Sequence, residues 1–128
     1  MKLKDIDVDF SFTNADDLER LEKAAKKVQE KAETGEKEEL SLSESIRKEC
    51  QIINDFLDET FGEGIAQKLF KGKNDLQEHM EIFTDIMNAK IEMTKTTQNL
   101  YDTLENKAKY MPNRETRRYN NRYNKGRR

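Results

Sequence analysis

The sequence has few of the residues that build catalytic, metal and disulfide sites. Its 128 residues include one Cys, one His, one Pro and no Trp. The single Cys50 cannot form an internal disulfide, and the start of the chain lacks an apolar signal segment, so we expect a cytoplasmic protein. No stretch approaches the roughly 18 apolar residues that span a bilayer, so we expect no membrane partner.

Apolar side chains are also scarce. Hydrophobic residues make up 34% of the chain and charged residues 39%, whereas ordinary globular chains are about 25% charged. The core is therefore thin for one domain of this length. A chain with so little to bury either leaves segments disordered or completes its core against a partner.

Apolar residues at spacings of three and four predict helices over about residues 14–34, 42–60, 64–70 and 74–109. Thr13 or Asn14, Ser41 or Ser43, and Asn74 are the expected caps. The last helix has the longest apolar stripe, and at full length it would span roughly 50 Å. Because the stripe weakens near Lys95–Thr97, the helix either continues beyond a compact domain or breaks there. The stripe comprises Leu76, Met80, Phe83, Met87, Ile91, Thr94, Thr97, Tyr101, Leu104 and Ala108.

The N-terminal segment alternates apolar and polar residues. Ile6, Val8, Phe10 and Phe12 recur with a period of two, which predicts a half-buried strand or arm over residues 4–12. A strand needs a hydrogen-bonding partner, and the chain offers no second strong strand. The segment is therefore either a strand that pairs with another subunit or an extended arm that lies on the helices.

Two glycine-containing turns flank the short third helix. We expect Phe61 and Phe70, together with Phe83, to anchor the core, and the glycines to permit sharp reversals because glycine adopts positive φ without strain. We interpret the segment as a structural corner. Its residues are Phe61, Gly62, Gly64, Phe70, Gly72 and Asn74.

No pattern in the sequence predicts catalysis, a metal or a cofactor. His79 stands alone on a helix and is expected at the surface, while Cys50 lies on an apolar stripe and is expected to be buried. The residues before Gly62 place apolar groups where an EF-hand loop needs oxygen ligands. The residues from Gly64 to Lys73 have the wrong spacing for a phosphate loop. We therefore expect no enzyme.

Charge is distributed unevenly along the chain. From Asn106 to the end there are nine basic residues and one acid, Glu115, a net charge of +8, whereas residues 1–105 carry −10. Residues 111–128 have no apolar period and are expected to form a disordered basic tail. Arginines interleaved with tyrosines suit contact with phosphates and bases; equally, the tail could dock on an acidic surface. Its candidate contact residues are Arg114, Arg117, Arg118, Tyr119, Arg122, Tyr123, Arg127 and Arg128.

Short motifs in this chain resemble those of a known group of proteins. The stretches 58–64, 68–70 and 74–76, with 10–12, 15–17 and 45–50 upstream, resemble small proteins encoded in the tail gene region of siphophages and prophages of Gram-positive bacteria. The likeness covers roughly residues 8–90, and residues 113–118 resemble the endings of tail assembly chaperones. The resemblance implies a helical adaptor that engages the tape-measure and tail tube proteins in the host cytoplasm.

The sequence thus predicts a mainly α protein: an N-terminal extended strand or arm, a small helical bundle with a long C-terminal helix, and a disordered basic tail. The favoured hypothesis is a non-enzymatic tail assembly chaperone that binds other tail proteins and forms a homo-oligomer. The alternative is a small nucleic-acid-binding phage protein that acts through its tail. No helix-turn-helix pattern supports sequence-specific reading in that alternative.

Overall fold

A computed structural model describes residues 1–35 and 39–110 of the chain. Two short strands, β1 (Lys2–Leu3) and β2 (Ile6–Asp7), are followed by four helices. These are α1 (Ala15–Gly35), α2 (Leu42–Phe61), α3 (Ile65–Phe70) and α4 (Leu76–Tyr110). The mainly α fold expected from the sequence is confirmed. The chain divides into two compact units, Met1–Met93 and Thr94 onwards.

The first two helices begin where short polar side chains satisfy free backbone N–H groups. The side-chain oxygen Oδ1 of Asn14 accepts hydrogen bonds from the backbone N–H groups of Asp16 and Asp17, both at 3.1 Å. The Ser41 hydroxyl accepts the N–H of Glu44 at 3.2 Å. Such caps each contribute about 1 kcal/mol. Of the two alternatives at each position, Asn14 and Ser41 are therefore the caps.

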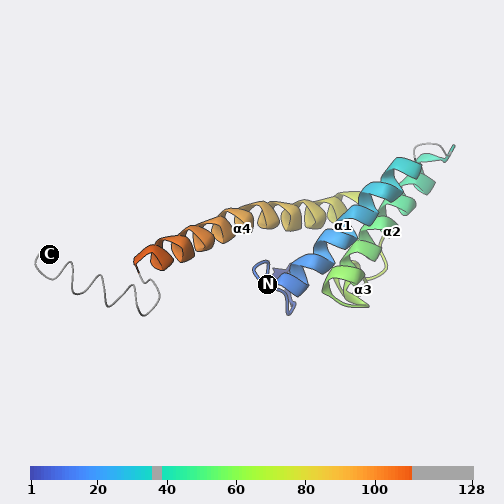
Figure 1. Ribbon diagram of the computed structural model, residues 1–128. Helices are drawn as coiled ribbons and strands as arrows, with labels where there is room; N and C mark the ends of the chain where they lie inside the picture. Colours follow the sequence, from blue (N-terminus) through green and yellow to red (C-terminus); the bar gives the residue numbers. More distant parts are fainter. Residues whose placement is uncertain (36–38, 111–128) are drawn as a thin grey trace, which may run out of the picture. The chain divides into compact units, whose positions relative to one another are not determined.

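In the first unit, α1 and α2 run side by side in opposite directions (Figure 1). Leu21 and Ala24 of α1 are buried in the same core as Phe56 and Leu57 of α2. Lys27 pairs with Glu59, and Lys31 with Asp55 at 3.2 Å, at the half-exposed edge of this contact. Exposed ion pairs contribute little, so the apolar residues hold the two helices together.

The N-terminal segment is an arm that lies on the helices. β1 and β2 form a two-stranded antiparallel sheet in which Lys2 pairs with Asp7 and Leu3 with Ile6, and Lys4 adopts a φ of +53° in the turn. Residues 8–12 form no strand, yet Val8, Phe10 and Phe12 are buried. The strand that the sequence predicted over residues 4–12 is therefore confined to Ile6–Asp7. The period of two instead places apolar side chains on the helical core.

Helix α4 runs from Leu76 to Tyr110 without the break considered near Lys95–Thr97. Its cap lies one residue later than expected, because the Oδ1 atom of Asp75, and not the side chain of Asn74, accepts the N–H of Glu78 at 3.1 Å. Its most buried residues are His79, Ile82 and Ile86, which are offset by about one position from the expected stripe. Met80 and Ile91 of that stripe are 43% and 56% exposed.

Candidate functional site

The corner between α2 and α4 is built on backbone conformations that favour glycine. Gly62 has φ +124° and ψ 146°, and Gly64 has φ +91° and ψ −4°. Gly72 has φ +80°. Gly62 and Gly64 thus have the positive φ that the sequence led us to expect. Side chains rarely tolerate these regions, so the two reversals depend on glycine.

Asp58 ties the end of α2 to the start of α3. Its backbone oxygen accepts the N–H of Gly62 at 3.1 Å, and its Oδ1 atom accepts the N–H of Ala66 at 3.0 Å. The carboxylate thereby satisfies a free N–H group of the first turn of α3, where negative charge is favourable. No pattern in the sequence assigns this role to Asp58. An acid four residues before a glycine is too common a signal to reveal this role.

The two aromatic residues of the corner, Phe61 and Phe70, pack against different parts of the structure. Phe61 packs its ring edge-on against Phe10 of the arm, with centroids 4.9 Å apart. Phe70 is buried and stacks on the ring of His79, with centroids 3.6 Å apart. Phe83 contacts Phe56 edge-on at 5.1 Å. Phe70 is thus a core anchor as expected, whereas Phe61 and Phe83 are only partly buried and pack at the edge of the core.

His79 is fully buried, so the expectation of a surface histidine is wrong. Its Nδ1 atom donates to the backbone oxygen of Asp75 at 2.7 Å, and its Nε2 atom lies 2.9 Å from Oδ1 of Asn54 on α2. Buried polar groups are tolerated when they are hydrogen-bonded. The imidazole therefore joins α2, α3 and α4 as a structural group, and both of its nitrogens are already engaged.

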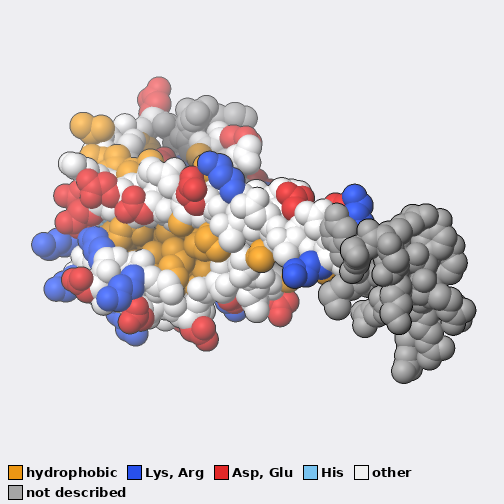
Figure 2. Space-filling model, turned by 90° about the vertical axis from the view of Figure 1, so that its left-hand side faces the viewer, with side chains coloured by type: hydrophobic (Ala, Val, Ile, Leu, Met, Phe, Trp, Pro, Cys, Tyr) orange, Lys and Arg blue, Asp and Glu red, His pale blue; other side chains and the backbone are white. Residues whose placement is uncertain are grey.

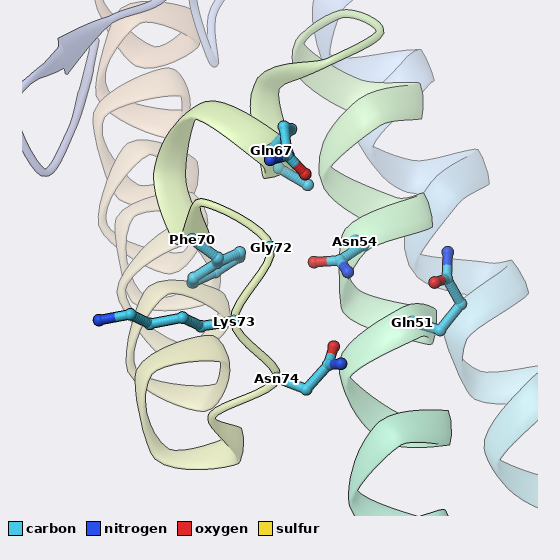
Figure 3. A pocket seen from close by; sticks show the side chains of 8 residues that line it. Gln51, Asn54, Gln67, Phe70, Gly72, Lys73 and Asn74 are labelled. Atoms are coloured by element: carbon cyan, nitrogen blue, oxygen red, sulfur yellow. The ribbon is translucent and has the colours of Figure 1, made fainter.

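A cavity of about 260 Å³ is lined in part by Asn54 and Phe70, the two side chains that contact His79. Figure 3 shows Asn54 and Asn74 pointing into the space between α2 and the turn, while the Lys73 amine points away. The walls carry carboxamides and neither a carboxylate nor a thiol. Asn54 is already paired with His79, so the cavity supplies no reactive group. Its lining residues are Gln51, Asn54, Ala66, Gln67, Phe70, Gly72, Lys73 and Asn74.

Cys50 is buried, as expected from its place on an apolar stripe. Burial raises the pKa of its thiol, and the neighbouring charges of Asp75 and Glu49 raise it further. The nucleophilic thiolate is therefore disfavoured in the folded protein. Within residues 1–35 and 39–110, no group of three His, Cys, Asp or Glu side chains could hold a metal ion.

The uncovered surfaces of α4 are more distinctive than these polar sites. We name Met80, Phe83, Met87 and Ile91 the side stripe. Phe83 and Met87 are partly buried against the core, whereas Met80 and Ile91 are exposed. Figure 2 shows a patch of hydrophobic side chains framed by charged ones on one face of the molecule. Exposed apolar side chains along a helix, as at Met80 and Ile91, suit the docking of another protein.

A second apolar surface lies in the later part of α4. Leu100, Tyr101 and Leu104, which we name the distal face, are 54%, 61% and 68% exposed. In the described part of the chain, no helix is apolar over a length that could cross a membrane. The candidate contact residues of the basic tail, from Arg114 to Arg128, lie outside the described residues.

These features define a small helical protein whose distinctive surfaces are exposed apolar stretches of one long helix. Residues 4–121 match the model of a family described as a family of unknown function (DUF6673). The match covers most of the chain, which therefore belongs to this family. No curated protein and no solved structure matches the chain.

Proposed function

We propose that this chain is a non-enzymatic tail assembly chaperone or adaptor of a phage or prophage. It would act in the cytoplasm of the bacterial host and bind the tape-measure and tail tube proteins through helical surfaces. The proposal is supported by the resemblance of residues 8–90 to proteins of phage tail gene regions. The observation that carries it is the side stripe, where Met80 and Ile91 stay exposed on a well-formed helix.

The chemistry of the side stripe suits a helical partner. Met80, Phe83, Met87 and Ile91 follow one another at spacings of three and four residues, which aligns them along one side of α4. Methionine side chains are flexible and adapt to different partner surfaces. An amphipathic helix of a tail protein could lay its apolar side along this stripe. The stripe is thus a docking surface that leaves the core intact.

Replacing Ile91 with Glu is expected to weaken binding to tail proteins at least tenfold. Burial of an isoleucine side chain contributes about 1.5–3 kcal/mol, and every 1.4 kcal/mol is about tenfold in affinity. Purified chain would be titrated with segments of tape-measure and tail tube proteins. Leu42→Glu is the matched control, because Leu42 is 79% exposed at the start of α2, away from the stripe. If the Ile91→Glu variant binds as tightly as the intact chain, the side stripe is not the binding surface.

The second candidate function, nucleic-acid binding, is supported by the alternation of Arg and Tyr from Arg114 to Arg128. It predicts that the full chain retards single-stranded RNA or DNA at low salt, and that binding falls steeply as salt rises. Replacing Arg117, Arg118 and Arg122 with Gln should then weaken binding. No retardation by the intact chain at low salt would end this hypothesis without affecting the first one.

A further inference from the structure

The distal face consists of large apolar side chains that nothing in the described chain covers. Leu100, Tyr101 and Leu104 are each more than half exposed. A cluster of this size is costly to leave in water, because each such side chain gains about 1.5–3 kcal/mol when fully buried. A contiguous apolar stretch of this kind marks an interaction site.

The distal face repeats the face by which α4 packs into the first unit. Ile82 and Ile86 are 5% and 0% exposed. Leu100 and Leu104 each follow 18 residues later, which is five turns of an α-helix. Met93 and Thr97 continue the spacing between the two pairs. The same side of α4 therefore remains apolar beyond the residues that the first unit buries.

The spacing of the apolar residues on this side of α4 is also the same in both directions along the helix. Met93, Thr97, Leu100 and Leu104 are separated by four, three and four residues. In two antiparallel copies centred between residues 98 and 99, Met93 would face Leu104, and Thr97 would face Leu100. Helices that pack with such spacings interlock their side chains. A second copy of the same helix can therefore cover the face.

The distribution of charge along the chain favours a second copy in antiparallel orientation over one in parallel orientation. Residues 1–105 carry a net charge of −10, and residues 106–128 carry +8. In a parallel pair the two basic ends would lie together, and so would the two acidic parts. An antiparallel pair centred between residues 98 and 99 instead brings Lys95 of each copy level with Asp102 of the other, where opposite charges attract.

We propose that the distal face of α4 binds the distal face of a second copy in antiparallel orientation, so that the protein is a homodimer. Residue i of one copy then contacts residue j of the other, and j contacts i, as in a two-fold symmetric interface. The dimer contact is made by Leu100 and Leu104, five turns beyond Ile82 and Ile86, whereas Tyr101 lies five turns beyond Phe83 of the side stripe. The proposed dimer does not depend on the identity of any tail protein.

The mass of the purified full-length chain tests this proposal. Sedimentation equilibrium should give twice the 15.1 kDa of the chain. Leu104→Glu, and independently Leu100→Glu, should weaken the dimer at least tenfold while the circular dichroism stays helical. Leu42→Glu, which places the same charge on another exposed leucine, should remain dimeric. A monomer at all concentrations, or a dimer that ignores both distal substitutions, would overturn the proposal.

Orientation is tested by salt and by spin labels. Raising the ionic strength should weaken the antiparallel dimer, because it screens attraction between Lys95 of each copy and Asp102 of the other. Nitroxides on Asn99→Cys or Asn106→Cys, in a Cys50→Ala background, report the direction. The two labels at position 106 should lie clearly farther apart than the two at position 99. Equal distances, or a dimer that tightens with salt, would contradict the antiparallel arrangement.

Discussion

Replacing His79 with Ala is expected to lower the free energy of unfolding by about 3 kcal/mol, a typical cost for removing a large buried side chain. The ring is fully buried and stacked on Phe70 at 3.6 Å. Its two nitrogens are engaged by the Asp75 carbonyl and the Asn54 side chain. The substitution therefore removes packing and leaves the Asn54 amide without its partner. For a unit of this size the midpoint of thermal unfolding should fall by about 12–24 °C.

Urea denaturation, monitored by circular dichroism, would measure how far the free energy of unfolding falls in the His79→Ala variant. Thr84→Ala is the matched control on the same helix, because Thr84 is exposed, and its effect should stay within about 0.5 kcal/mol. His79→Leu separates packing from hydrogen bonding, since it keeps an apolar side chain at the position. A His79→Ala protein as stable as the intact chain would show that the ring does not join the three helices.

Gly62→Ala should lower the free energy of unfolding by about 2 kcal/mol through backbone strain alone. The residue adopts φ +124° and ψ 146°, a region almost closed to residues with a Cβ atom. An added Cβ would meet no atom within 4 Å, so steric contact with neighbouring residues contributes nothing. The glycine is required by the conformation of the chain and not by lack of space.

Gly64 offers the matched comparison, because its added Cβ would also enter open space. It adopts φ +91° and ψ −4°, close to the left-handed region that asparagine tolerates better than other residues. Gly64→Asn should therefore cost less than Gly64→Ala, whereas Gly62→Asn should rescue little. Chemical denaturation of the four variants gives the ranking. A Gly62→Ala protein with unchanged stability would contradict the assigned backbone conformation.

Much of the fold follows from local patterns. The helices over α1, α2 and α3 begin and end within a few residues of the expected positions, because caps, glycines and apolar spacing act on neighbouring residues. Cys50 was expected inside because it shares a stripe with Ile53 and its neighbours, and it is buried. These predictions required no knowledge of what the helices pack against.

The face of α4 could not be predicted in the same way. The expected stripe ran through Met80, Phe83 and Met87, yet the side that packs innermost carries His79, Ile82 and Ile86. Two adjacent sides of the helix are apolar, and a histidine interrupts the one that is buried. Its burial depends on Asn54, which lies 25 residues earlier in the chain. No pattern within α4 indicates that such a partner exists.

For the candidate interaction surfaces, too, some properties follow from the sequence and others from tertiary packing. The sequence by itself determined that the segment of α4 is uninterrupted by Pro or Gly and apolar along much of its length, because these properties belong to the residues and their spacing. It left open a break near Lys95–Thr97, and the structure shows one continuous helix. Tertiary packing decided which of those apolar residues are covered. Ile82 and Ile86 lie inside because they share one core with residues of the N-terminal arm, α1, α2 and α3, whereas Ile91 and Leu104 remain exposed. Exposure is a property of contacts between distant segments, so only the folded structure could show which of these residues stay exposed.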